Sequence, residues 1–207
     1  PAWTFKLAVP VAALQEGAAT LETRMPLPCT GGLQYGNRYF RCWEDEGHGD
    51  VTLARAIEVS CDVYFYQLGL RLGMERLLTE VTKMSFRERT GIDLPGENTP
   101  VWPRNVEYFN QKYGSAWTQA QVLNLSIGQG DNTQTVAGMA RFYSALANGG
   151  LAVRPEIVKG RLERDRLFTL TDAQMRGLRD ALAGVVSARG TAASAALRGA
   201  VLAGKTG

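Results

Sequence analysis

Apolar residues recur at helical spacing in two parts of the chain that also carry clear start and stop signals. From position 175 to 185 they follow Thr171-Asp172-Ala173-Gln174, which has the form of a capping box, and Gly190 ends the pattern. A second apolar stripe runs from Thr135 to Ala147 and ends at Asn148-Gly149-Gly150. Weaker patterns predict further helices over residues 4–15, 53–59, 63–72 and 74–84. The chain is therefore predicted to be mainly helical.

Strand signals are few and short. Leu151-Ala152-Val153 is expected to pair with Ile157-Val158, and Val201-Leu202-Ala203 is expected to form a strand that leads into the last residues. Residues 93–114 are rich in Pro, Gly and Asn, which predicts a long surface loop.

The composition is that of an ordinary globular domain, and it limits the classes of function. The 207 residues are 45% hydrophobic and 21% charged, which is enough for one domain with a core. The net charge of +3 is small and the basic residues are scattered, which argues against binding of nucleic acid. No stretch of about 18 apolar residues is present, so we expect no membrane-spanning helix. No signal-peptide pattern opens the chain.

Three short motifs carry residue types suited to acyl transfer. Lys205-Thr206-Gly207 reads K-T-G and Ser60-Cys61-Asp62 reads S-x-D. Residues 1–6 have the frame of a third motif, S-x-x-K, but Trp3 occupies the serine position and Lys6 the lysine position. Side chains three positions apart share one helix face, so a desolvated lysine can take the proton of a hydroxyl at the first position. Such triplets recur by chance, so their order and the segments between them carry the argument.

Longer segments between the motifs point to one family. They are Gly47-His48-Gly49 and residues 60–67, 90–97, 126–130 and 147–150. With them the chain resembles, over nearly its whole length, the transpeptidase domain of the class B penicillin-binding proteins, in the penicillin-binding protein 2 branch. An aspartate at position 62 is typical of that branch.

The resemblance implies an α+β, β-lactamase/transpeptidase-like fold, with an antiparallel sheet, flanking helices and a helical lobe. Residues 1–207 are expected to be a partial transpeptidase domain, cut at the S-x-x-K-type motif and at K-T-G. Such a piece would be mostly helical and would lack most of the sheet.

The resemblance also implies a reaction and the residues that serve it. The reaction is peptidoglycan D,D-transpeptidation during cell elongation, in which a serine attacks the penultimate D-alanine of a stem peptide; β-lactams acylate the same serine. No cofactor is expected for this catalysis. Because Trp3 lacks a nucleophilic atom, we expect this chain to be inactive. The residues expected at the catalytic site, besides the nucleophile position at Trp3, are Lys6, Ser60, Asp62, Lys205, Thr206 and Gly207.

Partners and location follow from the same resemblance. The expected partners are stem peptides ending in D-Ala-D-Ala, β-lactams in competent relatives, and membrane proteins of the elongation complex, with no nucleic acid. The expected location is the periplasmic face of the bacterial inner membrane, reached through an N-terminal anchor absent from this chain. The alternative is a non-catalytic, transpeptidase-like protein that binds an elongation partner or senses peptidoglycan or β-lactams. A sensor or class D β-lactamase is disfavoured by the long segments between the motifs.

Two sets of side chains near the motifs have simpler interpretations. Thr4 is the hydroxyl nearest the nucleophile position, but it lies two residues from Lys6, about 200° round an α-helix, and is expected to face away. Ser60 and Asp62 are residue types that cap helices, so they could cap one starting at Val63, with or without a catalytic role.

Three cysteines and the only histidine gather between positions 29 and 61: Cys29, Cys42, His48 and Cys61. Three thiolates and one imidazole are a complete tetrahedral zinc set. The alternatives are a Cys29–Cys42 disulfide, which leaves one thiol over, and unlinked buried side chains. Zinc at this position would fix the S-x-D turn through Cys61 without taking part in the chemistry.

Overall fold

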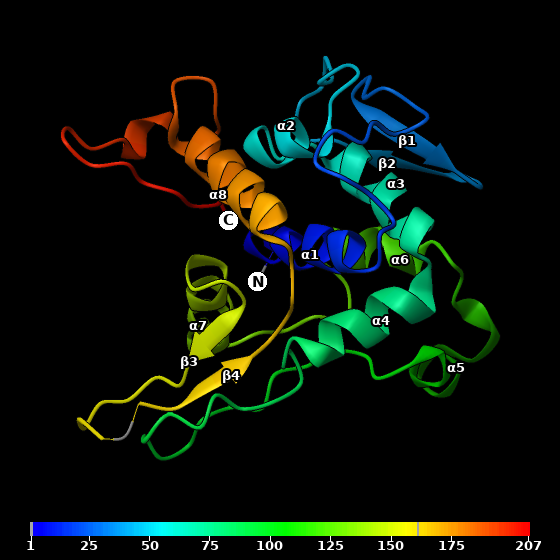
Figure 1. The fold of residues 1–207 in the computed structure, drawn as a ribbon. Helices are drawn as coiled ribbons and strands as arrows, with labels where there is room; N and C mark the ends of the chain where they lie inside the picture. The colour runs from blue at the N-terminus through cyan, green and yellow to red at the C-terminus, as the bar shows by residue number, and fades with distance from the viewer. Residues whose placement is uncertain (1, 161) are drawn as a thin grey trace.

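The computed structural model describes residues 2–160 and 162–207, and most of its regular structure is helical (Figure 1). Two short antiparallel sheets, β1–β2 and β3–β4, lie on opposite sides of the molecule. The elements in chain order are the 3₁₀ helix η1 Ala2–Leu7, α1 Ala8–Gln15, β1 Gly32–Tyr35, β2 Arg38–Arg41, α2 Leu53–Glu58, α3 Asp62–Leu72, α4 Met74–Lys83, α5 Val106–Tyr113, η2 Gly114–Ala116, α6 Gln121–Ser126, α7 Val136–Ala147, β3 Leu151–Val153, β4 Arg164–Arg166, α8 Asp172–Val186 and η3 Ala193–Ala195.

Helix α1 lies at the centre of the fold, with α3, α4, α7 and α8 arranged around it (Figure 1). Every residue of α1 from Ala8 to Leu14 is buried. A helix that is apolar on all sides is stable only when other elements cover it. Pro10 falls in the first turn of α1, where a proline disturbs a helix least. Because η1 runs into α1 without a break, the burial of α1 also fixes the position of η1 in the fold.

Helices α3 and α6 approach each other closely at Gly69. A Cβ added to Gly69 would lie 1.8 Å from Ser126 Oγ, a separation that no side chain can tolerate. Ser126 Oγ in turn donates a hydrogen bond to Val122 O, so its position is fixed within α6. The absence of a side chain at Gly69 is therefore what lets these two helices pack.

Most of the predicted helices are confirmed. Helix α8 begins with the predicted capping box, in which Thr171 accepts from the backbone of Gln174 and Gln174 accepts from the backbone of Thr171. It ends at Val186 rather than Gly190, because Ser187 adopts an extended backbone. Helix α7 is also confirmed, capped by Thr135. The predictions over 53–59, 63–72 and 74–84 correspond to α2, α3 and α4 within a residue at each end.

The helix predicted over residues 4–15 is only partly correct. Its first part, Ala2–Leu7, is a 3₁₀ helix, and the α-helix starts at Ala8. A 3₁₀ helix has three residues per turn, so positions i and i+3 eclipse one another. Trp3 and Lys6 therefore share one face more strictly than an α-helix would allow, and Lys6 Nζ lies 5.0 Å from the Trp3 ring centroid.

Both strand predictions need correction. Leu151–Val153 does form β3, but its partner is β4, with Ala152 opposite Asp165, and not 157–158. Residues 157 and 158 instead donate their backbone N–H groups to the Asp93 carboxylate, which holds them in a bend. Residues 201–203 are not a strand either: Val201 is 90% exposed, and no described segment pairs with them. An extended segment becomes a strand only through such pairing.

Several elements are absent from the predictions, among them α6 Gln121–Ser126, α5 and the β1–β2 hairpin. The loop predicted over 93–114 contains α5, which Asn105 caps by accepting from Tyr108 N. Strands β1 and β2 form a hairpin whose two-residue turn is Gly36-Asn37, with Gly36 at φ +57°. A glycine in this turn position is a usual hairpin signal.

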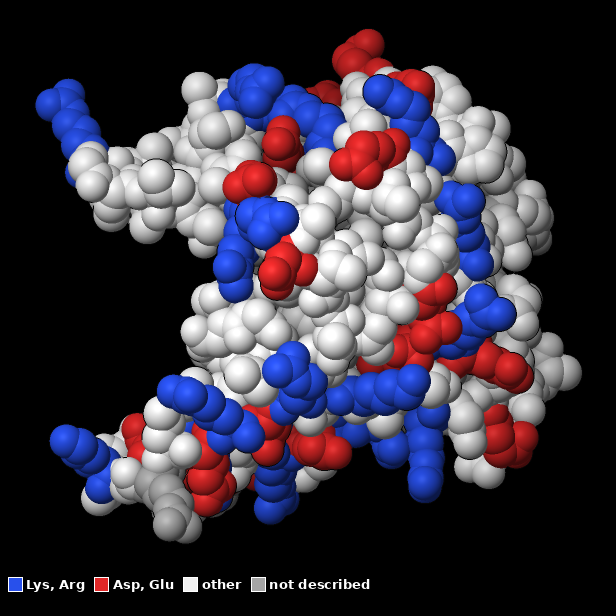
Figure 2. Space-filling view, in the orientation of Figure 1, with Lys and Arg blue, Asp and Glu red and all other residues white. Residues whose placement is uncertain are grey.

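The face in view in Figure 2 carries acidic and basic side chains in a mixed pattern. The face in view is deeply hollowed between the C-terminal segment and the part built from α7, β3 and β4 (Figures 1 and 2). Both ends of the chain lie near the inner end of this hollow (Figure 1). None of the helices within the described ranges is long and apolar enough to cross a membrane.

Candidate functional site

Ser60 occupies a strained backbone position between α2 and α3. Its φ is +56°, in the left-handed region that favours glycine. Ser60 N donates to Ile57 O and Cys61 N donates to Ala56 O, which is the hydrogen-bond pattern of a Schellman motif with Ser60 at the position where glycine is usual. Strain of this kind at a non-glycine residue often accompanies function. The hydroxyl of Ser60 is therefore the feature of interest.

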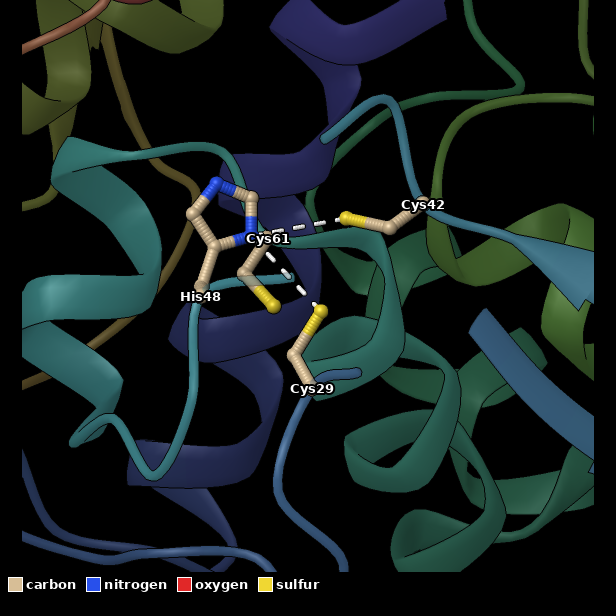
Figure 3. Close-up of side chains that lie close together, drawn as sticks. All are labelled: Cys29, Cys42, His48 and Cys61. Atoms are coloured by element: carbon tan, nitrogen blue, oxygen red, sulfur yellow. Dashed lines mark hydrogen bonds between the residues drawn. The ribbon is translucent and has the colours of Figure 1, made fainter. Parts of the chain in front are cut away.

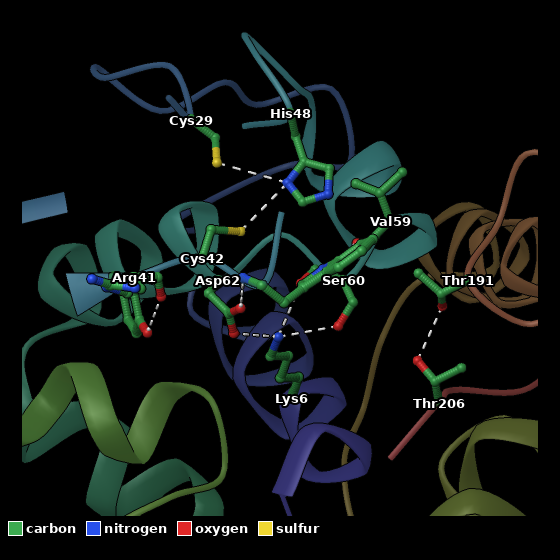
Figure 4. A network of polar contacts seen from close by, with 12 residues as sticks. Lys6, Cys29, Arg41, Cys42, His48, Val59, Ser60, Asp62, Thr191 and Thr206 are labelled. Atoms are coloured by element: carbon green, nitrogen blue, oxygen red, sulfur yellow. Dashed lines mark hydrogen bonds and ion pairs between the residues drawn. The ribbon is translucent and has the colours of Figure 1, made fainter. Parts of the chain in front are cut away.

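Lys6 reaches the S-x-D turn from η1. Its Nζ lies 2.6 Å from Asp62 Oδ1, 3.1 Å from Ser60 Oγ and 3.0 Å from Ser60 O (Figure 4). The Lys6 side chain is 0% exposed and that of Asp62 is 4% exposed. Burial lowers the pKa of Lys6, and the Asp62 carboxylate opposes that shift. Burial likewise raises the pKa of Asp62 against the effect of Lys6.

Lys205 approaches the same hydroxyl from the other end of the chain. Its Nζ lies 2.9 Å from Ser60 Oγ and 3.1 Å from Thr206 Oγ1. Burial and the charge of Lys6 lower the pKa of Lys205 to about 7. Thr206 Oγ1 also lies 3.0 Å from Thr191 Oγ1 (Figure 4). One hydroxyl thus stands between two lysines whose burial favours the neutral amine.

Trp3 lies in the wall of the cleft that these residues face. The cleft has a volume of about 230 Å³ and is lined by Trp3, Trp43, Ser60, Thr191 and Thr206. The indole of Trp3 is half-buried there. The residue in the nucleophile position therefore presents an aromatic ring, and no hydroxyl, to the cleft.

Sequence reasoning missed two residues of the cleft, Trp43 and Thr191. Trp43 N donates to Asp62 Oδ2 at 3.1 Å, and its indole N–H donates to Val59 O at 3.0 Å. It therefore braces both ends of the S-x-D turn. In the sequence, the position of Trp43 directly after Cys42 is the one sign that it lies near the site. Thr191 lies in an Ala- and Gly-rich segment that offers no such sign.

The capping interpretation changes, and Thr4 has neighbours that the sequence did not indicate. Asp62 and Ser60 do not cap α3: the N-cap residue is Cys61, without a side-chain cap bond, and Asp62 lies inside the helix. Thr4 packs against the last residue of K-T-G, since a Cβ added to Gly207 would lie 2.7 Å from Thr4 Cγ2. Its backbone carbonyl accepts from Tyr143 Oη at 2.9 Å. Thr4 thus lies beside the K-T-G end of the site.

The cysteines and the histidine converge next to the S-x-D turn. The three sulfurs and a histidine nitrogen all lie within 4.8 Å of one another, and His48 Nδ1 is 3.7 Å from Cys29 Sγ and 3.5 Å from Cys42 Sγ (Figure 3). All three thiols are free, so the alternative Cys29–Cys42 disulfide is not formed. Gly47 makes the approach possible: a Cβ there would lie 2.2 Å from Cys29 O.

This donor set fits a tetrahedral zinc ion. Bonds of about 2.3 Å to sulfur and about 2.0 Å to nitrogen place neighbouring ligand atoms about 3.5–3.8 Å apart in a tetrahedron. The distances from His48 Nδ1 to the sulfurs of Cys29 and Cys42 already fall in that range. A hydrogen bond from Cys61 lowers the pKa of Cys42 to about 2, which favours one thiolate in the cluster. Backbone bonds between Cys29 and Gly49, and from Cys42 N to Gly31 O, hold the loops in place.

Comparison with known proteins identifies the class. A family model described as penicillin binding protein transpeptidase domain matches residues 1–207, so the chain belongs to that family. Among the curated relatives that it matches is the peptidoglycan D,D-transpeptidase MrdA of Escherichia coli strain K12, which is 31% identical over 163 residues. That alignment covers 79% of this chain and 26% of the relative. The chain thus spans about a quarter of the length of this relative.

Solved structures agree. The complex between penicillin-binding protein 2 and MreC from Helicobacter pylori matches with a TM-score of 0.85 and 29% identity, over 100% of this chain and 39% of that one. Pseudomonas aeruginosa penicillin-binding protein 2 in complex with WCK 5153 matches with a TM-score of 0.80 and 31% identity, over 94% of this chain and 46% of that one. The expected fold class and the resemblance to penicillin-binding protein 2 are confirmed.

Proposed function

We propose that this chain is part of a peptidoglycan D,D-transpeptidase of the penicillin-binding protein 2 type, and that Trp3 keeps it from forming an acyl-enzyme. One observation carries the proposal. The side chains of Lys6 and Lys205 both lie within hydrogen-bond distance of Ser60 Oγ in a cleft whose wall includes Trp3. This arrangement supports a site that is complete except for its nucleophile.

In a competent version of this site, each residue has a definite role. A serine at position 3 would share a face of η1 with Lys6, which would take its proton as the oxygen attacks the penultimate D-alanine carbonyl. The Ser60 hydroxyl, between Lys6 and Lys205, would pass a proton to the nitrogen of the departing D-alanine. An amine of a neighbouring strand would then attack the acyl group and release the serine oxygen.

The remaining residues would bind and orient the substrate. Lys205 and Thr206 would meet the substrate carboxylate, and Gly207 would allow a peptide backbone to lie close. Asp62 would orient the Lys6 side chain through their contact of 2.6 Å and would stabilise the ammonium that forms when Lys6 takes the proton.

Replacement of the nucleophile by tryptophan removes this chemistry for two reasons. An indole offers no atom that can form the acyl ester, and loss of the serine nucleophile costs about 10⁶ in kcat in a serine hydrolase. The ring also forms part of the wall of a cleft of about 230 Å³, where the carbonyl would have to enter.

The test is intact-mass measurement of the purified protein after incubation with a fluorescent penicillin. We expect no covalent adduct. Stoichiometric labelling would contradict the proposal, and the variant Thr4→Ala would then show whether the hydroxyl beside Gly207 is the group acylated.

We also propose that Cys29, Cys42, His48 and Cys61 hold a structural zinc ion. The bound ion would supply no chemistry to the reaction, since all four of its coordination positions would be filled by protein. These residues would cross-link the loop before β1, the end of β2 and the segment before α2 to the start of α3. Because Cys61 separates Ser60 from Asp62, this would stabilise the S-x-D turn from behind.

For the whole protein we propose a periplasmic, membrane-anchored location and partners in the elongation machinery. The support is the Helicobacter pylori complex, which pairs penicillin-binding protein 2 with MreC. A non-catalytic role, in which the cleft binds peptidoglycan or a β-lactam without reacting, is the second candidate, and Trp3 is the observation that favours it. Reversible binding of benzylpenicillin, seen by calorimetry without an adduct by mass, would distinguish it from an empty cleft.

A further inference from the structure

A second and larger cavity lies away from the cleft, between the segment before Cys29, the β1–β2 hairpin and α3. Its volume is about 680 Å³, about three times that of the cleft. None of the residues that line the cleft contributes to it. Its lining includes Arg24, Leu27, Leu33, Tyr35, Leu70 and Arg71. We refer to this cavity as the hairpin pocket.

The walls of the hairpin pocket are largely apolar and are held in place before any ligand binds. Met25 and Leu33 line it with only 7% and 5% of their surface exposed. The Gln67 side chain fixes the backbone of Leu27, which forms another part of the wall. Gln67 Nε2 donates to Leu27 O at 2.9 Å, and Gln67 Oε1 accepts from Leu27 N at 3.0 Å. Leu27 nevertheless leaves 55% of its surface exposed. A preformed apolar cavity with an exposed rim is suited to receive a side chain.

The charge at the mouth of the hairpin pocket has one sign. Arg24 and Arg71 both line it, and no acidic residue does. Arg24 pairs with Asp50 at 3.0 Å, but both side chains are more than half exposed, so the pair is weak. Arg71 takes part in none of the ion pairs found among residues 2–160 and 162–207. A guanidinium beside apolar surface is a good partner for a carboxylate.

An unpaired strand edge borders the hairpin pocket. Among the residues that the structure describes, strand β1 pairs only with β2. Along an antiparallel pair, residues whose backbone groups bond to the partner strand alternate with residues whose backbone groups point away from it. Cys42 N donates to Gly31 O, so Gly31 is of the first kind. Gln34, three positions further on, is of the second kind, and its backbone N–H and C=O point away from β2. Gln34 is exposed and lines the pocket. Such an edge can accept another strand by backbone hydrogen bonding.

We propose that the hairpin pocket binds an extended segment of another protein, which pairs with the outer edge of β1, places an apolar side chain in the cavity and sets a carboxylate against Arg71. The open backbone edge favours a peptide over a lipid, because only a peptide can use both the edge and the cavity. The two arginines favour an acidic segment over a basic one. The inference does not depend on catalysis, since the cleft shares no lining residue with this pocket.

The test measures fluorescence anisotropy of a labelled peptide of about six residues, the usual length of a strand, in which Leu and Thr alternate between terminal Glu residues. Saturable binding is expected. Arg71→Glu should weaken it at least about fivefold, as expected for reversal of a partly exposed charge contact. Arg76→Glu, at an exposed position on α4, makes the same change in net charge and should leave binding unaltered. Hydrogen exchange should slow at Gln34 when the peptide is bound.

Two altered peptides and one membrane probe complete the test. N-methylation of alternate backbone nitrogens should abolish binding, and Lys in place of both terminal Glu residues should weaken it for the parent and improve it for Arg71→Glu. The proposal is overturned if no saturable binding is found, or if the Glu-ended and Lys-ended peptides bind the parent protein equally. It is also overturned if Arg71→Glu and Arg76→Glu change the affinity for the Glu-ended peptide to the same extent. Binding to equimolar phosphatidylglycerol–phosphatidylcholine vesicles, without binding of the peptide, would also overturn it and assign the surface to a membrane.

Discussion

Lys6 Nζ and Asp62 Oδ1 lie 2.6 Å apart in a part of the fold where neither side chain has more than 4% of its surface exposed. The contact joins η1, at the start of the chain, to the first turn of α3. A buried ion pair adds little net stability compared with apolar residues of the same size, but removal of one partner leaves a charge without compensation. The pair therefore matters chiefly because it fixes where the S-x-D turn lies relative to the nucleophile position.

A double-mutant cycle tests this coupling. Lys6→Met and Asp62→Asn should each lower the free energy of unfolding by about 3 kcal/mol, because each strands the other group in the interior. The double variant should lose clearly less than the sum, as measured by urea denaturation. Glu163→Gln breaks the exposed pair with Arg154 and serves as the control, with an expected change within about 0.5 kcal/mol. Additive losses at Lys6 and Asp62 would contradict the coupling.

The strained backbone of Ser60 leads to a second prediction. Ser60→Gly and Ser60→Ala both remove the hydroxyl, but only glycine adopts φ +56° without cost. The glycine variant should therefore unfold with a free energy about 1 kcal/mol higher than that of the alanine variant. Ser85, at φ +64° and outside the cleft, is the matched control and should show the same difference. Equal stability of the two Ser60 variants would show that the turn relaxes.

Burial of Lys205 predicts how stability depends on pH. Its pKa is about 7 in the folded chain and near 10.5 when exposed, so between these pH values the unfolded chain binds more protons than the folded one. This group therefore makes stability rise with pH through that window. Lys205→Met removes the effect, and its melting temperature should exceed that of the parent most below pH 7. The excess should shrink as the pH approaches 10.5, and a difference that is constant with pH would contradict the shift.

Removal of metal tests the zinc proposal. Protein purified without added zinc should contain about one zinc per chain, and chelation should lower the melting temperature. Affinity should fall as the pH drops, because the cysteine thiols must lose their protons to bind zinc as thiolates. Cys29→Ser should reduce the zinc content. Sub-stoichiometric zinc together with a Cys29–Cys42 disulfide in a peptide map would refute the proposal.

Local signals explain what could be predicted of the fold. The signals that predict helix α8 lie in its own segment of the chain. They are the capping box at Thr171 and the apolar stripe that follows it. Pairing of β3 could not be predicted in the same way, because β4 reads Arg-Asp-Arg and all three residues are exposed. Apolar alternation, the usual signal of a strand, is absent from it.

The candidate site likewise contains residues that the sequence could indicate and residues that it could not. Its motif residues were found because a family resemblance placed them, and Lys6, Ser60 and Lys205 could be named although up to 199 positions separate them. Trp43 and Thr191 reach the cleft from segments without a motif. Periodicity also could not reveal that η1 is a 3₁₀ helix, since a side chain at i+3 lies on the same face in both kinds of helix.

The most direct test of the central claim is the variant Trp3→Ser. Restoring the hydroxyl on the face of η1 that carries Lys6 should yield one covalent penicillin per chain by intact mass, whereas the parent yields none. Trp3→Ser combined with Lys6→Met should again yield none, because the serine would lose its base. A Trp3→Ser variant that melts like the parent but takes up no penicillin would contradict the claim that Lys6, Ser60 and Lys205 form an intact site that lacks only its nucleophile.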